Sequence, residues 1–327
     1  MATGAPLIFI HYGPASYLRD TLRCAVRSNP DKRLVLLGDE TNRRFVPAGA
    51  EFHPFSQFEH SEKFRTFLDV FHVIQGSRHR FKKHGGTERW LQFVFARWFF
   101  IEAFVAQEGL DAFWTFDSDT LVLASLARRE SRFADVDATT QCRNRCLNGW
   151  IGSLSLVQRY TACIVQLFSN QDYLDYQRKR LEEQAGLAFN EMDAFEEFRA
   201  RESVKTLHAA DVRNGEAFDD ALGFPEGFEV SPEAIVSNLR VKQLWTTREG
   251  GIFARTTGSG EMVRLLTCNM SWMPDYLTRR FAGMGSVPEG FAPGDFRKIS
   301  LFPTPVERLR RKWEDVTRAW VPWRSPS

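Results

Sequence analysis

The chain of 327 residues is long enough for one large domain or two ordinary ones, and its 43% hydrophobic and 26% charged residues are typical of a soluble globular protein. The formal net charge of +2 gives no reason to expect a nucleic-acid partner. A content of 29 Phe and nine Trp indicates wide apolar interiors or surfaces.

The first part of the chain carries an alternating pattern of strands and helices. A strand is predicted at PLIFIHYG (6–13), a helix over 17–29 and a second buried strand at LVLLGD (34–39). This order of strand, helix and strand indicates parallel pairing. Residues 51–87 are predicted to be a long irregular stretch rich in histidine, with KKHGGTE (82–88) as a mobile loop that could close over a ligand.

A second helix followed by a strand is predicted at 88–106 and 113–117. The strand lacks polar alternation beyond one threonine, which is typical of a strand covered on both faces. NGW (148–150) carries a turn signal, IGSLSLV (151–157) is predicted to be another strand, and QRYTACIVQLF (158–168) a helix. Together these elements predict an α/β protein with a mostly parallel central sheet flanked by helices.

The second half of the sequence is more irregular. Residues 173–202 are highly charged with a helical period, and 250–272 are predicted to form a hairpin across TTGSGE (256–261). No long repeat or flexible linker occurs in the sequence. We therefore expect one continuous domain over residues 1–327 with a variable second half.

The C-terminal segment 303–324 is predicted to be an amphipathic helix. An apolar stripe follows one of its faces at three- and four-residue steps: Val306, Leu309, Trp313, Val316 and Trp320. Between residues 306 and 324, six Arg or Lys stand against three Asp or Glu. A basic helix with tryptophan suits an anionic membrane surface, so peripheral membrane contact is one expectation, and packing on its own domain is the alternative.

Features that report on the cellular compartment point to the cytoplasm. The start of the chain has an apolar run of only four residues and no basic lead, so no secretory signal is expected. No window holds 18 uncharged apolar residues. The five cysteines lack paired CxxC spacing, so we expect free thiols in a reducing compartment rather than a zinc site at Cys142 and Cys146.

Two carboxylates interrupt the apolar stretch FWTFDSDTLVL (113–123): Asp117 and Asp119. Residues two apart in an extended segment point the same way, so both are expected at the end of a buried strand, where open α/β sheets bind ligands. Two ionised carboxylates repel one another unless a cation lies between them or one is protonated. Their oxygens suit Mg²⁺ or Mn²⁺, which would bind substrate phosphates in turn. The alternative is a solvated Asp-Ser-Asp turn.

One arginine lies inside the helix predicted at 88–106, which is apolar on almost every side and must be interior. Arg97 is a charge that costs several kcal/mol to bury without a partner. That partner could be structural, such as Glu102 or an aspartate of the core. Equally, the guanidinium could bind a phosphate or carboxylate of a substrate.

An arginine on a helix, followed by an apolar strand that ends in Asp-x-Asp, resembles the core of GT-A-fold glycosyltransferases, whose fold is Rossmann-related. The chain is similar, more narrowly, to bacterial glycosyltransferases of the galactosyltransferase and capsule-synthesis type in four segments: FIHYGPASYLRDTLRCAVRSNPDKRLVLLGDE, FVFARWFFIEAF, FWTFDSDTLVL and GLAFNEMDAF. The resemblance implies a nucleotide-sugar-binding half at 1–125 and an acceptor-binding half at 126–300.

The resemblance also implies roles for individual residues. Asp117 and Asp119 would hold the divalent cation that neutralises the diphosphate of a nucleotide-sugar, and Arg97 would lie by the sugar or the phosphates. The nucleoside pocket would be lined by residues at the ends of the first two strands: His11, Gly13, Tyr17 and Asp39. Glu191, in NEMDAF, matches a position where such enzymes often carry an acid near the acceptor and the transferred sugar.

One departure from the family pattern concerns the metal. Such enzymes often supply a further ligand from a histidine in a late strand, where this chain has RLLTCNMSWM, and no histidine follows His208. Asn269 is the candidate substitute, because the neighbouring Cys268 is a soft ligand poorly matched to Mg²⁺. The chain is therefore expected either to hold the ion more weakly or to be a diverged, inactive relative.

Three of these positions have a plain structural alternative. His11 could be a hydrogen-bonded core histidine. Glu191 lies among many acidic residues and could belong to a solvated helix face. NGW (148–150), predicted as a turn, could also line an acceptor site.

The expected activity is transfer of a hexose from a nucleotide-diphosphate sugar, UDP-linked, to a hydroxyl of a glycan or glycolipid, dependent on Mn²⁺ or Mg²⁺. One alternative is a catalytically degenerate protein of the same fold that binds carbohydrate or another partner. The other is a sugar-1-phosphate nucleotidyltransferase, which usually carries a Gly-rich basic loop after the first strand, where this chain has HYGPAS.

Overall fold

The computed structural model describes residues 4–79, 87–236, 239–284 and 294–309. The helices in these segments are α1 (Leu18–Ser28), α2 (Glu62–Val70), α3 (Thr87–Gln107), α4 (Leu154–Ser169), α5 (Gln171–Glu183), α6 (Glu191–Arg201) and α7 (Asp275–Gly283). Short 3-10 helices are η1 (Glu40–Phe45), η2 (Phe55–Gln57) and η3 (Ala127–Phe133).

The strands of the described segments form a large sheet, a smaller sheet and a two-stranded ribbon. The large sheet contains β1 (Leu7–His11), β2 (Leu34–Gly38), β3 (Glu51–Pro54), β4 (Phe113–Asp117), β6 (Ala138–Gln141), β7 (Cys146–Ile151) and β8 (Thr206–His208). The smaller sheet contains β9 (Glu216–Ala217), β10 (Leu244–Thr247), β11 (Gly250–Arg255), β12 (Met262–Leu265) and β14 (Arg297–Lys298). The ribbon pairs β5 (Thr120–Val122) with β13 (Thr267–Asn269).

The large sheet has the strand order β3-β2-β1-β4-β7-β6-β8. Pairings among β3, β2, β1 and β4, and between β6 and β8, are parallel, whereas β7 runs antiparallel to both of its neighbours. The chain builds outward from β1 to β3 and then returns to place β4 on the other side of β1. This reversal creates a switch point between the carboxyl ends of β1 and β4, where open α/β sheets bind ligands.

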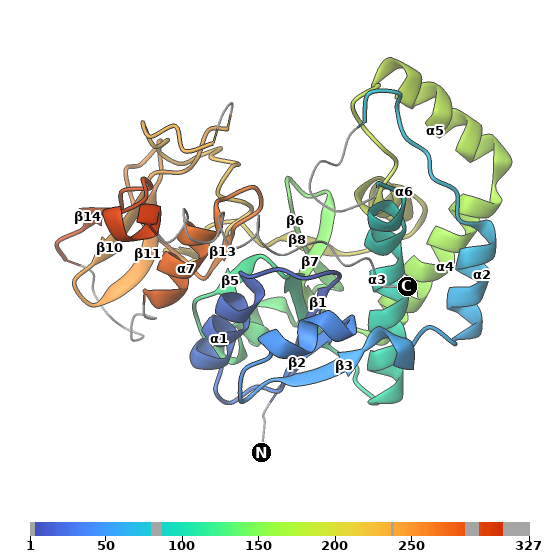
Figure 1. The fold of residues 1–327 in the computed structure, drawn as a ribbon, viewed down its shortest axis with the longest axis horizontal. Coiled ribbons are helices and arrows are strands. Elements are labelled where there is room, and N and C mark those ends of the chain that lie inside the picture. Colours follow the sequence, from blue (N-terminus) through green and yellow to red (C-terminus); the bar gives the residue numbers. More distant parts are fainter. Residues whose placement is uncertain (1–3, 80–86, 237–238, 285–293, 310–327) are drawn as a thin grey trace.

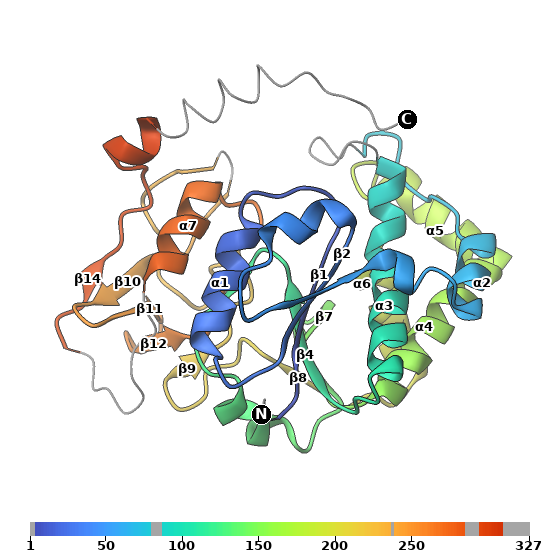
Figure 2. The same cartoon turned by 60° about the horizontal axis from the view of Figure 1, so that its bottom comes forward.

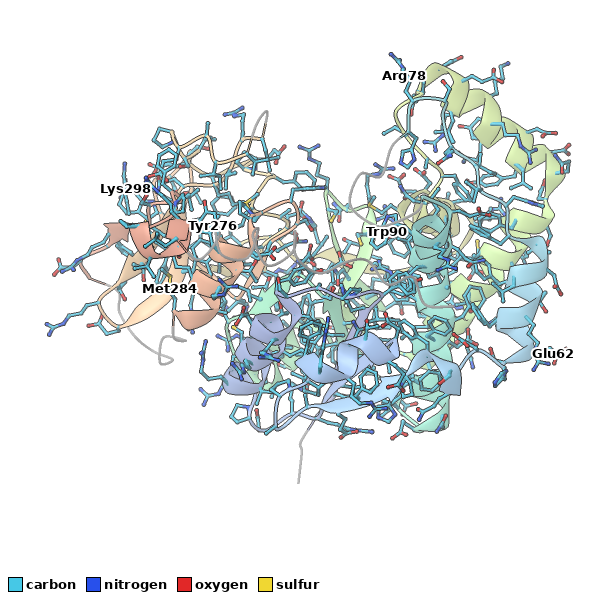
Figure 3. The ribbon with its side chains drawn as sticks, in the orientation of Figure 1. Glu62, Arg78, Trp90, Tyr276, Met284 and Lys298 are labelled. Atoms are coloured by element: carbon cyan, nitrogen blue, oxygen red, sulfur yellow. The ribbon has the colours of Figure 1, made fainter. Side chains whose placement is uncertain are left out.

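Helices and the smaller sheet flank the large sheet on opposite sides (Figures 1 and 2). The helices α2, α4 and α5 lie on one flank, and β10, β11 and α7 on the other, with α1 and α7 side by side. Figure 3 marks the two flanks by Glu62 on α2 and Met284 just beyond α7. A mostly parallel sheet covered by helices confirms the predicted α/β fold class.

The aromatic residues fill the interior on both faces of β4. Trp114 and Phe116 stack with Phe218 on one face, and Phe113 joins the core cluster of α3 and α4 on the other. The helix α3 contributes fully buried rings, among them Phe95 and Phe99. The interpretation of β4 as a strand covered on both faces is therefore confirmed.

The irregular stretch predicted for 51–87 is wrong in part, because it contains β3 and the helix α2. Ser61 caps α2 by accepting a hydrogen bond from the Phe64 backbone N–H, and Phe64 and Phe67 bury one face. The helix was missed because only these two apolar residues mark its period, and charged residues and histidines surround them in the sequence. Of the predicted loop KKHGGTE, residues 82–86 lie outside the described residues, and the remaining two begin α3.

Two predictions near residue 150 are also wrong. NGW lies inside β7 rather than in a turn: Gly149 has φ 94°, and a Cβ there would collide with Thr139 Oγ1, so only glycine fits this strand position. The segment IGSLSLV is not a strand, since Ser153 caps α4 at the Leu156 N–H and its apolar residues begin the helix.

The remaining element predictions have mixed outcomes. The strands β1, β2 and β4, the helices α1 and α3 and the hairpin of β11 with β12 form where expected. Of the predicted helix 303–324, residues 305–309 are helical, and 310–324 lie outside the described residues. The division into halves at residue 125 stays a prediction.

Candidate active site at the ends of β1 and β4

Parallel pairing of β1 with β4 brings two sets of predicted residues together. Ile10 is the register partner of Asp117, so His11 lies beside the residues that follow β4. The His11 Nδ1 is 2.7 Å from Ser118 Oγ, and its ring packs edge-on against Tyr17. Burial and the nearby Asp119 charge raise the pKa of Tyr17. His11 is thus hydrogen-bonded but only partly buried, at the edge of the site.

Asp39 holds the loop that follows β1. It accepts hydrogen bonds from the Gly13 N–H and from the Thr41 N–H at the start of η1. Asn42 donates to the Gly13 carbonyl oxygen at 2.7 Å. The predicted pair of Gly13 and Asp39 is therefore in direct contact, and Asp39 joins the ends of the first two strands.

Arg97 of α3 lies between two carboxylates. Its guanidinium donates to Asp117 Oδ1 at 2.6 Å and to Glu191 Oε1 at 3.1 Å, and only 12% of the side chain is exposed. The structural partner considered for it, Glu102, instead binds Lys63 at 3.0 Å. One buried positive charge therefore faces two negative ones.

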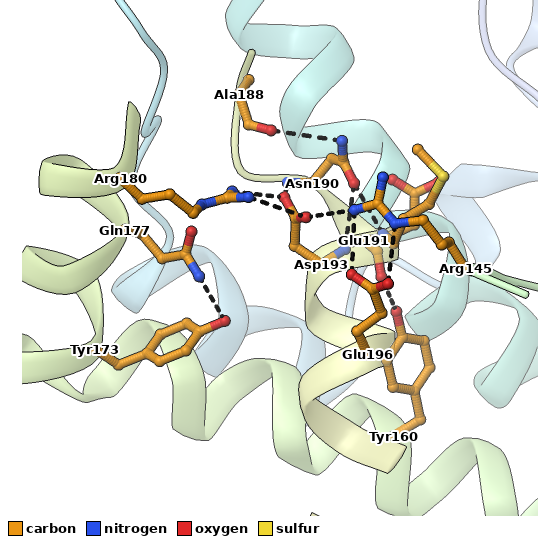
Figure 4. Close-up of polar contacts among 11 residues, drawn as sticks. Arg145, Tyr160, Tyr173, Gln177, Arg180, Ala188, Asn190, Glu191, Asp193 and Glu196 are labelled. Atoms are coloured by element: carbon orange, nitrogen blue, oxygen red, sulfur yellow. Dashed lines mark hydrogen bonds and ion pairs between the residues drawn. The ribbon is translucent and has the colours of Figure 1, made fainter. Parts of the chain in front are cut away.

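Glu191 is the first residue of α6, and its side chain is 12% exposed, so it does not belong to a solvated face. Burial raises its pKa to about 7, although Arg97 opposes the shift. The Tyr160 hydroxyl donates to its backbone carbonyl at 2.7 Å (Figure 4). Its neighbour Asp193 is occupied by other partners, since Arg145 and Arg180 bind that carboxylate. Glu191 is thus the acid of α6 that faces the site.

The two carboxylate oxygens of Asp119 have different surroundings. Ser271 Oγ donates to its Oδ2 at 3.1 Å, whereas its buried Oδ1 has no hydrogen-bond partner within the described part of the chain. Burial, and then the charge of Asp117, raise the pKa of Asp119 to about 7. Ser118 and Asp119 do form a turn. The turn is enclosed, which disfavours the solvated alternative.

Asn269, the suggested third metal ligand, lies behind this turn. It is fully buried, and its Oδ1 accepts a hydrogen bond from the Ser271 N–H at 3.0 Å. Its Nδ2 donates to the Asp220 carbonyl at 3.3 Å. In this arrangement Asn269 orients Ser271, which in turn reaches Asp119.

A small cavity lies beside the ion pairs. Arg97, Trp98, Asp117 and Asn148 are among its lining residues, and its volume of about 10 Å³ is room for roughly one water. Three buried donors of that lining have no partner among the residues described: Arg97 Nε, Trp98 Nε1 and Asn148 Nδ2. The first residue of NGW therefore lines the site next to Asp117, although the segment is a strand.

The carboxylates suit a divalent cation. Asp119 offers a buried oxygen that no described residue contacts by a hydrogen bond, and the Asp117 side chain is 27% exposed. No cluster of three or more His, Cys, Asp or Glu suited to a metal occurs in the described segments. Mg²⁺ and Mn²⁺ bound to nucleotides are often held by one or two carboxylates together with substrate phosphates, so this pair fits the group.

Two contributors to the site were not predicted from the sequence. Ser118, between the aspartates, binds His11, and Ser271 binds Asp119 from 152 residues further along the chain. A serine in a loop carries no periodic or motif signal, so only the fold reveals Ser271.

Across the described ranges, none of the helices combines the length and apolar character needed to cross a bilayer.

Comparisons with known proteins gave matches at the level of structure alone. No family model and no curated protein sequence matches the chain. Among solved structures, mouse xyloside xylosyltransferase 1 in its apo form is similar with a TM-score of 0.40 and 11% identity, over 62% of this chain and 84% of that one. The PaToxG glycosyltransferase is similar with a TM-score of 0.38 and 10% identity, over 61% and 68%. At these scores and identities, the likeness carries no inference about what this chain does.

Proposed function

We propose that the protein is a GT-A-like glycosyltransferase that moves a hexose from a UDP-sugar to a hydroxyl of a glycan or glycolipid. The observation that carries the proposal is the pair Asp117 and Asp119 at the switch point of the sheet, where the buried Oδ1 of Asp119 has no hydrogen-bond partner among the described residues. Such an oxygen is costly to bury unless a cation or donor occupies its free side.

Asp117 and Asp119 would hold Mn²⁺ or Mg²⁺, and the cation would neutralise the diphosphate of the donor as it departs. The chain's own contribution is to keep both carboxylates in place. Ser271 orients Asp119, and Arg97 binds one oxygen of Asp117. His11, Gly13, Tyr17 and Asp39 would line the nucleoside end of the donor, next to the carboxyl end of β1.

Arg97 and Glu191 are proposed as the catalytic residues. The guanidinium of Arg97 would stabilise the negative charge that develops on the leaving diphosphate. Glu191, with a pKa raised to about 7, can exchange a proton near neutral pH and would accept one from the acceptor hydroxyl. In the structure, the carboxylate of Glu191 and the guanidinium of Arg97 are 3.1 Å apart.

The experiment measures UDP release from a panel of UDP-sugars with Mn²⁺ and no acceptor. Slow release that stops with EDTA is expected for the wild type. Asp119→Asn should lower release by about 100-fold or more, because it removes a metal-binding charge. Asp111→Asn, an exposed change just before β4, is the matched control and should leave release unaltered.

Three results would contradict the proposal. Unchanged release by Asp119→Asn would exclude the assigned metal site. Tight UDP binding without release of UDP from any donor would favour a catalytically degenerate protein that binds carbohydrate or another partner. Formation of UTP that depends on pyrophosphate would favour the nucleotidyltransferase.

We place the reaction in the cytoplasm, with peripheral contact at the inner membrane face through residues 303–324 as an expectation from their sequence. Co-sedimentation of the full chain with vesicles of anionic and of neutral lipid tests it. Binding only to the anionic vesicles is expected, and equal or no binding to both would contradict it.

A further inference from the structure

Trp272 is an exposed tryptophan next to the candidate site. Its side chain is 57% exposed, whereas the other tryptophans of the described ranges are buried or partly buried. It directly follows Ser271, the residue that binds Asp119. Neither the donor site nor the packing of the fold explains why so large an apolar ring is exposed to solvent here.

The backbone of Trp272 is held in a conformation that favours glycine. The Met273 N–H donates to the Met270 carbonyl at 2.8 Å, which closes a four-residue turn with Trp272 in its third position. There its φ is 65°, in the left-handed region that bulky residues rarely adopt. A tryptophan at this position costs stability relative to glycine, and the turn itself does not require the ring.

The turn is anchored firmly to the site. Asn269 accepts the Ser271 N–H, Ser271 Oγ binds Asp119, and the Met270 N–H donates to the Asp119 carbonyl at 3.0 Å. The backbone next to Trp272 is thereby fixed relative to the carboxylate of Asp119.

A second aromatic ring packs beside Trp272 and carries an arginine on its face. Phe224 lies 5.7 Å from Trp272 between ring centroids, and the guanidinium of Arg143 lies 4.4 Å over the Phe224 ring. Arg143 has φ 59°, and its backbone N–H donates to Asp220 at 2.8 Å. Its guanidinium also pairs with Glu226. The apolar surface of the two rings is thus bordered by exposed polar side chains: the guanidinium of Arg143 as a hydrogen-bond donor and the carboxylate of Glu226 as an acceptor.

We propose that Trp272, with Phe224 beside it, is the platform on which a neutral pyranose ring of the acceptor stacks, an assignment that rests on the proposed transferase function. The apolar C–H face of a sugar covers an aromatic ring, while its hydroxyls need polar partners at the rim, as Arg143 and Glu226 provide. A single exposed ring is too small for a stable protein interface. The ion pair of Arg143 with Glu226 also leaves little charge to attract an anionic lipid surface.

The test is saturation-transfer NMR on the full chain with methyl glycosides of galactose, glucose and N-acetylglucosamine, without nucleotide or metal. Saturation of the sugar C–H protons of at least one glycoside is expected with the wild type. Trp272→Gly should weaken it by roughly tenfold, at the upper end for loss of an aromatic contact. Trp272→Tyr should retain most of it.

Thermal unfolding separates the platform from a role in folding. Glycine relaxes the left-handed position, so Trp272→Gly should unfold at the same or a higher temperature than the wild type. Tyr176→Ala, which removes a 60% exposed ring on α5, is the matched control and should leave saturation unaltered.

Equal saturation in the wild type and Trp272→Gly, or none with any glycoside in the wild type, would overturn the proposal. Because this readout needs no donor, its failure is distinct from that of the transferase function, which is judged by UDP release.

Discussion

Two carboxylates of the candidate site, Asp119 and Glu191, have raised pKa values. Asp119 and Glu191 both have a pKa raised to about 7, and burial is the largest cause for each. Their neighbours differ, since Asp119 faces Asp117 and Glu191 faces Arg97. The first is therefore suited to gain a cation, and the second to exchange a proton.

Glu191→Gln tests the proton-exchange role. The variant keeps the shape of the side chain but cannot accept a proton, so transfer kcat should fall by about 100-fold. In the wild type at saturating Mn²⁺, which keeps Asp119 ionised, kcat should rise with pH through about 7 as Glu191 ionises, and this limb should vanish in the variant. Glu196→Gln, at a 43% exposed side chain of the same helix, is the control and should keep the limb. A wild-type pH profile in Glu191→Gln would contradict the assignment.

At the scale of elements, a buried ion pair supports the strand behind the site. Lys242 Nζ lies 2.5 Å from Asp219 Oδ1, with side chains 2% and 0% exposed. The other oxygen of Asp219 accepts the Asn269 N–H at 2.9 Å, so the pair fixes β13 and through it the turn at Ser271.

Lys242→Met should destabilise the protein by about 3–5 kcal/mol, because it leaves Asp219 buried without its counter-charge. The measurement is the free energy of unfolding in urea. Arg178→Met breaks the exposed pair with Asp175 and should change that free energy by less than about 0.5 kcal/mol. Equal effects of the two changes would show that the buried pair is not a structural support.

Elements with strong periodicity were predictable from the sequence, and contacts between distant segments were not. Apolar runs in the sequence predicted β1, β2 and β4. The helix α3, which is apolar on almost every side, was also predicted, together with the interior position of Arg97. The turn predicted for NGW was wrong because Asn-Gly, which is common in turns, also fits this strand. Thr139 leaves no room for a Cβ at Gly149, so the strand requires glycine there. The partners of Arg97 and the contact of Ser271 with Asp119 depend on topology, which local pattern does not encode.

In the whole molecule, segments that are distant in the sequence meet at the carboxyl ends of the central strands. Asp117 ends β4, Arg97 lies in α3, Glu191 begins α6 and Ser271 follows β13. The two flanks of the fold thus meet the site from opposite sides, and the charge state of the site is linked to the stability of the whole chain.

The metal-free protein should be more stable at pH 5.5 than at pH 8. Asp119 and Glu191 have folded-state pKa values raised to about 7, so between roughly pH 4 and 7 the folded state binds more protons than the unfolded state. The free energy of unfolding should therefore rise as pH falls through 7, by on the order of 2 kcal/mol for each of the two carboxyls. The raised pKa of His208 beside Asp220 acts in the same direction.

Urea unfolding at the two pH values measures this linkage. The double change Asp119→Asn and Glu191→Gln should flatten the pH dependence, and Mn²⁺ with UDP should stabilise the wild type at pH 8. A stability that falls from pH 8 to 5.5 would contradict the assigned pKa directions.

A crystal structure of the protein with UDP and Mn²⁺ would show whether the two aspartates hold a metal ion. Manganese, located by its anomalous signal, should be bound to the carboxylates of Asp117 and Asp119 and to the diphosphate of UDP at the carboxyl end of β4. A nucleotide bound elsewhere, or manganese absent from both aspartates, would contradict the proposed active site.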